Sequence, residues 1–456
     1  MKRISIAILI SMFICPAILL TVYAMPDWPS DVWIQAEAGV VVDMDSGAVL
    51  LGQNIDTPYP PASITKLLTA LIVIENSNSE DIVTFSEDAV NNVEEGSGNK
   101  LNVAAGDQLT VEDCLYSLLL HSCNQVANAL AEHVAGSREA FVQMMNDKIA
   151  ALGCTKSHFA NPSGLNDDTQ VVTAYEMARI AQAAFSNPKL LEIDSSLSHD
   201  ISPTLNNPNG ITIYMEHKLV STSDENSEFY CPFAIGGKTG YTTPAGNTLV
   251  TYAEQDGRRL ISVILRGTPS QYYLDSKAQL QSGFQNFKNL DISKYDNTSN
   301  LFKEPVTING NTYEPSQLEL AGNSIVSVPA DTTDFKGIKR ILIKGLPNNP
   351  PSNAVGVIRY DYGEHHLGYA YLLKKDSNQA SAEVSATPSS SGTPQESDTP
   401  PSESTQSLQD ADLPPTVESK KDGIDPQSKL LFLAVLIIAG IAWCAVSFGS
   451  GKEDTQ

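Results

Sequence analysis

Ser63 and Lys66 are the first pair of residues whose types and spacing could do chemistry. They lie three positions apart at the start of an apolar run, ITKLLTALIVIEN. Residues three apart share one face of a helix, so the Lys66 amine can lie beside the Ser63 oxygen. A serine hydroxyl is a weak nucleophile and needs an adjacent base. A lysine can be that base if burial and neighbouring charge lower its pKa. The helix start would also offer backbone N–H groups to a developing oxyanion.

A second motif, Ser122-Cys123-Asn124, lies between two predicted helices. A hydroxyl and an amide two positions apart could point into one cleft. There Ser122 could relay a proton, and Asn124 could hold either Lys66 or a substrate.

The third motif is Lys238-Thr239-Gly240, which opens a predicted β segment. In that position the lysine could attract a carboxylate, and the glycine would let a substrate backbone approach the strand edge. Each motif alone is common. Their occurrence together, in the order helix start, inter-helix turn and strand, is specific.

The surrounding sequence predicts a sheet with helices on its faces to position these motifs. A hairpin is expected over residues 38–51, with its turn at Asp45-Ser46-Gly47. Further strands are expected at Asn247–Ala253 and Arg259–Leu265. The predicted helices are the run after Ser63, Val111–His121, Asn124–Ala135, Arg138–Leu152, Thr173–Phe185 and Gln271–Lys288.

Beyond residue 290 the pattern changes. Short β-like runs alternate with turn residues over 291–375, which predicts a small all-β domain. Residues 376–429 are rich in Ser, Pro and Glu and predict a disordered tether. Residues 430–448 carry no charge and would be ~28 Å long as a helix, which predicts one transmembrane helix. Residues 449–456 would then form a short cytoplasmic tail.

The N-terminus has the parts of a secretory signal peptide. Lys2 and Arg3 precede an apolar run, and we place cleavage after Ala24. An uncleaved membrane anchor is the alternative. We expect a single-pass protein of the cell membrane with an extracytoplasmic catalytic domain. Three lysines on the outer side of the predicted span oppose the positive-inside tendency: Lys420, Lys421 and Lys429.

Composition excludes some partners. Lys and Arg number 29 against 53 Asp and Glu, a formal net charge of −24. This charge argues against nucleic-acid binding, which requires a basic surface. We expect no cofactor and no metal, because His365-His366 is too short a pair for a metal site. Four cysteines lie in the predicted ectodomain, and both free thiols and disulfides are possible for them: Cys114, Cys123, Cys154 and Cys231.

Together the three motifs resemble the Ser-x-x-Lys, Ser-x-Asn and Lys-Thr-Gly set of the serine penicillin-recognising enzymes. The chain over about 38–288 is similar to the D-alanyl-D-alanine carboxypeptidase family, the low-molecular-mass penicillin-binding proteins. Four segments carry this likeness: PPASITKLLTALIVIEN, SCNQVANALAEHVAGS, HFANPSGLNDDTQVVTAYEMARIA and GGKTGYTTPAGNTLV. The resemblance implies an α/β (α+β), β-lactamase/transpeptidase-like catalytic domain over 25–290 with an antiparallel sheet.

The resemblance also implies the roles of individual residues. Ser63 would attack the carbonyl between the last two D-alanines of a peptidoglycan stem peptide, and β-lactam antibiotics would acylate the same oxygen. The N–H groups of Ser63 and Tyr241 would form an oxyanion hole. The implied catalytic residues are Ser63, Lys66, Ser122 and Asn124, and the implied substrate-binding residues are Lys238, Thr239, Gly240 and Tyr241.

The chain departs from the family pattern at several positions. Cys123 stands where Gly or Ala is expected, and we interpret it as a packing residue. Gln170 stands where His is expected. Many members place a carboxylate-binding arginine where this chain has Tyr272 or Tyr273, with Arg266 nearby.

Three other functions use the same motifs. A DD-transpeptidase would pass the acyl group to an amine, and the sequence does not exclude it. A serine β-lactamase would need a group to activate water, and residues 161–166 contain no glutamate. A non-catalytic penicillin-sensing or wall-binding protein would not need an intact set of motif residues.

Overall fold

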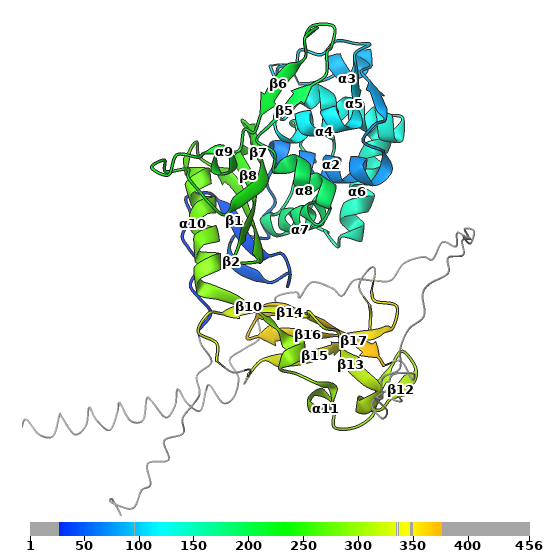
Figure 1. Cartoon of the computed structure of the whole chain (residues 1–456), viewed down its shortest axis with the longest axis vertical. Coiled ribbons are helices and arrows are strands. Elements are labelled where there is room, and N and C mark those ends of the chain that lie inside the picture. Colours follow the sequence, from blue (N-terminus) through cyan, green and yellow to red (C-terminus); the bar gives the residue numbers. More distant parts are fainter. Residues whose placement is uncertain (1–26, 95, 334, 336, 347–349, 376–456) are drawn as a thin grey trace, which may run out of the picture. The chain divides into compact units, whose positions relative to one another are not determined.

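The computed structural model describes residues 27–94, 96–333, 335, 337–346 and 350–375 (Figure 1). A five-stranded antiparallel sheet has the order β2-β1-β9-β8-β7, so β7 is an edge strand. The predicted hairpin forms β1 and β2, and the two later predicted strands form β8 and β9. The strands are β1 (Ala38–Asp43), β2 (Val49–Gln53), β7 (Ala234–Thr242), β8 (Gly246–Gln255) and β9 (Arg258–Gly267).

Successive apolar side chains of the central strands lie on alternate faces of the sheet, which creates two apolar layers. Val40 and Val42 belong to the larger core, while Val41 belongs to a separate core on the other face. In the neighbouring strand Ile261 and Leu260 divide in the same way. Because successive side chains of a strand point to opposite faces, each face needs its own cover. Two helices supply it, α7 (Ala174–Phe185) on the larger core and α10 (Gln271–Asn286) on the other.

Helices gather around the larger core and carry the first two motifs (Figure 1). Capping side chains fix several helix starts: Thr110 accepts the N–H of Asp113, and Ser137 that of Ala140. The helices are α2 (Lys66–Asn76), α3 (Glu87–Asn91), α4 (Val111–Leu119), α5 (Asn124–Ala135), α6 (Arg138–Ala151), α8 (Pro188–Asp194) and α9 (Lys218–Ser221). The predicted helices are all present, but α4 and α10 each end two residues early.

Two small hairpins in this half were not predicted. Strands β3 (Ile82–Thr84) and β4 (Gln108–Thr110) pair with each other, as do β5 (Ser198–Ile201) and β6 (Ile211–Tyr214). Each strand has only three or four residues, which is too short to establish a period of two in the sequence. Helix α8 was also missed, although Asn187 followed by Pro188 is a helix-start signature and Asn187 accepts the N–H of Lys189.

The later part of the chain forms a second antiparallel sheet, of order β10-β14-β17-β16-β15, with β13 also on β17. Its core includes Val326, Ile358 and Tyr360. The sheet begins earlier than expected, because β10 (Phe287–Asp291) pairs with β14, so the predicted boundary at residue 290 falls inside a strand. The other elements are α11 (Thr298–Leu301), β11 (Val306–Ile308), β12 (Asn311–Tyr313), β13 (Leu318–Leu320), β14 (Ile325–Pro329), β15 (Lys339–Ile343), β16 (Ala354–Tyr362) and β17 (His365–Lys374).

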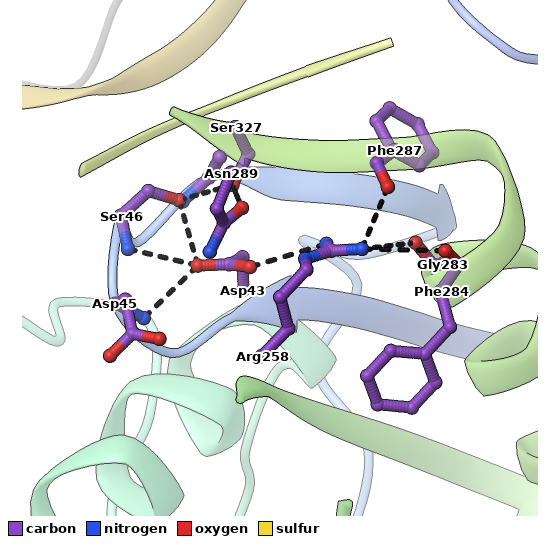
Figure 2. A network of polar contacts seen from close by, with 10 residues as sticks. Asp43, Asp45, Ser46, Arg258, Gly283, Phe284, Phe287, Asn289 and Ser327 are labelled. Atoms are coloured by element: carbon purple, nitrogen blue, oxygen red, sulfur yellow. Dashed lines mark hydrogen bonds and ion pairs between the residues drawn. The ribbon is translucent and has the colours of Figure 1, made fainter. Parts of the chain in front are cut away.

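A buried polar network ties the β1–β2 turn to the second sheet (Figure 2). Asp43 is fully buried and pairs with Arg258 at 3.3 Å. Its other oxygen accepts the Ser46 hydroxyl at 3.2 Å. Ser46 in turn lies 2.7 Å from the hydroxyl of Ser327 on β14, which donates to Asn289 on β10 at 2.8 Å. Hydroxyl-to-hydroxyl contacts therefore link two sheets that have separate apolar cores.

Four predicted segments lie outside the described residues: the signal peptide 1–24, the tether 376–429, the transmembrane helix 430–448 and the tail 449–456. Within the described ranges no helix has the length and apolar character needed to cross a membrane. These four segments remain predictions.

Candidate active site

Ser63 lies in a 3-10 turn, Ala62–Thr65, that runs directly into α2. Ala62 adopts φ +51°, a left-handed conformation that is rare for residues other than glycine and is often found near functional sites. Lys66 is the first residue of α2 and is fully buried, whereas Ser63 is half-buried. The Lys66 Nζ lies 2.9 Å from the Ser63 Oγ. The predicted Ser–Lys pair is therefore in direct contact.

The other contacts of the Lys66 amine are compatible with a neutral amine. Nζ donates to the Asn124 Oδ1 at 2.8 Å and to the Ser163 carbonyl at 2.5 Å. Both oxygens only accept hydrogen bonds, so they take two N–H groups of a neutral amine. In the neutral amine the remaining lone pair would face Ser63, whose hydroxyl could donate to it, whereas an ammonium would donate to all three oxygens. This arrangement is what a base that takes the Ser63 proton requires.

Burial favours the same state. Lys66 has a pKa well below that of an exposed lysine, first because burial penalises the charged form and second because Lys238 repels it. The apolar residues around α2 thus make a lysine available as a base.

The second motif follows α4. Ser122 is buried and adopts φ +59°, while Asn124 is the first residue of α5. Cys123 between them is buried in the larger core, where burial raises the pKa of its thiol to about 12. This supports its interpretation as a packing residue. The irregular turn between α4 and α5 allows Asn124 to reach Lys66.

The loop over residues 160–165 supplies the Ser163 carbonyl, which was not predicted. Gln170 holds this loop: its side chain accepts the N–H groups of Ala160 and Asn161 and donates to the Leu165 carbonyl. Gly164 adopts φ +85°, and a Cβ there would lie 1.9 Å from the Ala62 carbonyl oxygen. The Gln170 amide thus has a clear function where the family pattern led us to expect a histidine.

The third motif lies on edge strand β7, next to the serine turn. A Cβ on Gly240 would come within 2.8 Å of the Ser63 backbone nitrogen, so only glycine allows this approach. Lys238 is buried, and its Nζ donates to the Thr239 carbonyl at 2.9 Å. Burial lowers the pKa of Lys238 to about 8, although the nearby Glu216 carboxylate raises it.

Tyr241 is placed to contribute a backbone N–H beside Ser63. The N–H of Gly237 points away from β8, because it donates to Asp194 rather than to the sheet. The N–H groups of a strand alternate between its two edges, so Tyr241, four residues on, presents its N–H on the same free edge. The Tyr241 side chain itself is exposed.

A charged cluster at Glu216 was also not predicted. Lys100 lies 2.7 Å from Glu216, and the His121 Nδ1 lies 3.1 Å from it. Burial alone would raise the pKa of Glu216, but hydrogen bonds from His121 and Lys100 lower it to about 2. His121, interpreted from sequence as an ordinary helix-end residue, therefore belongs to a cluster that acts electrostatically on both site lysines.

The residues at the expected arginine position are largely buried. The rings of Tyr272 and Tyr273 contact each other in a tilted arrangement with centroids 4.1 Å apart, and the Tyr273 hydroxyl donates to the Glu216 carbonyl. Arg266 pairs with Glu37 at 2.8 Å and donates to the Pro244 carbonyl. The guanidinium of Arg266 is thus already occupied by other partners.

A pocket of about 140 Å³ flanks the serine turn. It lies between the loop that carries Gly164 and the end of β7. Its lining residues are Pro60, Pro61, Gly164, Leu165, Asn166, Asp167, Asp168, Gln170, Val171, Thr242 and Pro244. Among the described residues no group of three or more His, Cys, Asp or Glu side chains could hold a metal ion.

The geometry supports nucleophilic acyl transfer. A hydroxyl contacts a buried amine, the Ser63 backbone nitrogen lies beside Gly240 of β7, and Lys238 lies on the same strand. Such a reaction needs a nucleophile, a base, oxyanion donors and a carboxylate partner, and these groups could supply them.

Comparison with known proteins agrees with this chemistry. The profile of the D-alanyl-D-alanine carboxypeptidase family matches residues 25–268. A D-alanyl-D-alanine carboxypeptidase of Mycobacterium tuberculosis is 36% identical over 53% of this chain and 77% of its own length. One from Escherichia coli is 32% identical over 57% of this chain, and the match spans 64% of that relative, just under two thirds.

Similarity of structure extends further along the chain. The crystal structure of penicillin-binding protein 5 from Haemophilus influenzae aligns with a TM-score of 0.58 and 24% identity, over 76% of this chain and 98% of the other. At that identity it shows a shared penicillin-binding-protein fold of antiparallel sheets and helices. The family suggested by the three motifs is confirmed, and with it the enzyme class, a serine peptidase. The chain belongs to the D-alanyl-D-alanine carboxypeptidase family.

Proposed function

We propose that this enzyme is a serine-type carboxypeptidase that removes the terminal D-alanine from peptidoglycan stem peptides in cell-wall biogenesis. The observation that carries the proposal is the buried amine of Lys66. Two of its contacts are obligate acceptors and the third is Ser63. Such an amine can take the Ser63 proton as the oxygen attacks the carbonyl between the two D-alanines.

In the first step the N–H groups of Ser63 and Tyr241 stabilise the oxyanion. The C–N bond breaks, the leaving amine takes the proton by way of Lys66 and Ser122, and free D-alanine departs. Water then hydrolyses the ester on Ser63. The family relationship and the geometry of the site support these assignments.

The substrate would lie along the free edge of β7. Lys238 and Thr239 would bind its terminal carboxylate, and the absence of a side chain at Gly240 would let its backbone approach. The pocket beside Thr242 and Pro61 extends this line. A β-lactam carries both a reactive carbonyl and a carboxylate, so we propose that it acylates Ser63 as an inhibitor.

We further propose where the reaction takes place. A cleaved signal peptide at 1–24 and a helix at 430–448 would leave a single-pass protein with an extracytoplasmic catalytic domain over 25–290. A small β-rich domain over 291–375 and a tether over 376–429 would separate this domain from the membrane. Composition and hydropathy of these segments support the proposal.

The test is mass spectrometry of the full chain with and without a penicillin, beside a Ser63→Ala variant, together with an assay of free D-alanine from a peptide ending in D-Ala-D-Ala. We expect a stable adduct on Ser63 and D-alanine release, both lost in the variant. An adduct without release would indicate a transpeptidase or a sensor. Rapid penicillin turnover would indicate a β-lactamase, and no acylation would overturn the proposal.

A further inference from the structure

Asp194 lies next to the third motif and carries a buried carboxyl group. The mechanism proposed above does not use this group. It is the last residue of α8 and is fully buried. Its Oδ2 accepts the N–H of Gly237 at 2.5 Å, and its Oδ1 has no hydrogen-bond partner among the residues that the structure describes. A neutral amide would accept the same N–H without burying a charge. The hydrogen bond alone therefore does not explain why a carboxyl group is buried here.

Two glycines bring β7 against Asp194. A Cβ on Gly236 would lie 2.9 Å from the Asp194 Oδ2. A Cβ on Gly237 would lie 2.1 Å from the Val250 carbonyl oxygen and 3.0 Å from the His217 ring. Because neither position has room for a side chain, the carboxyl group holds the backbone directly before Lys238.

Lys238 is the charged group that acts on Asp194. Helix α8 packs against α2, α4, α7 and β7. On the three helices, Lys66 contacts Ser63 and Asn124, and the four carboxylates have partners elsewhere. Glu75 pairs with Lys148, Glu112 with Lys189, Asp113 with His199, and Glu176 with the N–H groups of Thr155 and Lys156. His217 stays neutral, because burial lowers its pKa to about 3.

We infer that Asp194 is a positioning residue for substrate binding, whose carboxylate fixes the backbone of Gly237 and whose charge keeps the Lys238 ammonium protonated for the substrate's carboxylate. The inference rests on the proposed function, in which Lys238 binds that carboxylate. It adds a fully buried partner 44 positions away in the sequence.

The direction of the effect follows from charge. Burial raises the pKa of Asp194 to about 7, so the carboxylate forms near neutrality. Lys238, with a pKa of about 8, loses its proton only slightly above that. A negative Asp194 therefore supports the ammonium most strongly between pH 7 and 9, and below pH 6 a protonated Asp194 supplies no charge.

The experiment compares Asp194→Asn with the wild type by measuring kcat and KM for a D-Ala-D-Ala peptide at pH 6 and pH 8.5. The amide still accepts the Gly237 N–H but carries no charge. We expect KM to rise about five- to tenfold at pH 8.5 and less than about twofold at pH 6, with kcat nearly unchanged. A loss that is equal at both values of pH would mean a purely structural role and overturn the inference, as would no loss at either.

Two matched variants sharpen the comparison. Glu216→Gln removes the other carboxylate that raises the pKa of Lys238, so KM should also rise at pH 8.5 and much less at pH 6, where the lysine keeps its proton. Glu192→Gln changes an exposed carboxylate on the same helix and should leave KM unchanged at both values of pH. If Glu192→Gln reproduced the Asp194→Asn pattern, the inference would fail.

A wild-type measurement covers the case in which Asp194→Asn does not fold. In protein with ¹³C-labelled aspartate carboxyls, one signal should titrate near pH 7, and penicillin acylation should move its titration. If no aspartate titrates between pH 6 and pH 8, the inference is wrong. Failure of the proposed function is seen separately, as a wild-type chain that forms no adduct on Ser63.

Discussion

At the scale of single residues, the site uses two lysines in opposite protonation states. Both are buried, and burial lowers the pKa of each. What separates them is their partners. Lys66 meets two carbonyl oxygens and a hydroxyl, whereas Lys238 lies within the influence of Glu216 and Asp194. Uncharged acceptors allow a buried lysine such as Lys66 to be neutral. Nearby carboxylates favour the protonated form of a lysine such as Lys238.

This difference predicts a bell-shaped dependence of kcat/KM on pH. Lys66 is active as the free amine, so the rate falls as pH drops through its lowered pKa. Lys238 is active as the cation, so the rate also falls as pH rises through about 8. Stopped-flow acylation by a chromogenic β-lactam between pH 5 and pH 10 measures both limbs. A rate that kept rising beyond pH 9 would contradict a role for the Lys238 cation.

At the scale of elements, the site depends on an edge strand that touches a helix start. Strand β7 pairs only with β8, which leaves its other edge free for the serine turn and the substrate. The neighbouring strand β8 adds a contact to the serine turn, because the Thr248 hydroxyl donates to the Pro61 carbonyl at 2.8 Å. Gly240 lies at the point of contact between strand and turn.

We expect Gly240→Ala to disable acylation while leaving the fold intact. The added methyl group would lie 2.4 Å from the Thr248 Oγ1 and 2.8 Å from the Ser63 nitrogen, so strand and turn must separate. A shift of ~1 Å at a catalytic group costs about 100-fold in rate. Penicillin acylation rate and circular dichroism together measure the effect. Gly322→Ala, where the methyl group meets only open space, is the control. Equal rates in both variants would mean that the contact is not needed.

Much of the element order follows from local sequence, but the contacts that complete the site do not. The hairpin at Gly47 and the helix after Ser137 arise from turn and capping residues that are adjacent in the chain. Ser163 contributes a backbone carbonyl, which every residue possesses, so no side-chain type marks it. Asp194 and Glu216 act on residues far along the sequence. Their roles depend on burial, which only the packed structure supplies.

At the scale of the whole molecule, two antiparallel sheets with separate cores are joined by polar contacts. The Ser46–Ser327 contact is fully buried and continues into Asp43 and Arg258 (Figure 2). A buried hydroxyl that loses its hydrogen-bond partner lowers the free energy of unfolding by about 1–3 kcal/mol. Removing one hydroxyl from this network should therefore destabilise the fold.

We expect Ser327→Ala to lower the free energy of unfolding by about 1–2 kcal/mol without changing acylation. It removes the partner of both Ser46 and Asn289, yet it lies on the second sheet and contacts no site residue. Urea denaturation gives the stability, and the penicillin reaction gives the activity. The control is Thr307→Ala, which removes an exposed hydroxyl from the same part of the chain. An acylation rate that fell with stability would show that the junction also shapes the site.

The four described cysteines are all buried and form no disulfide, so their thiols should react slowly with oxidants. Burial raises the pKa of Cys123 and Cys154 to about 12 and that of Cys231 to about 11, and it raises that of Cys114 as well. At pH 7 a thiol with such a pKa is a thiolate on the order of one part in ten thousand or less. Peroxides, disulfide exchange and electrophilic reagents all attack the thiolate. The thiols of these four cysteines should thus become reactive only when this part of the chain unfolds.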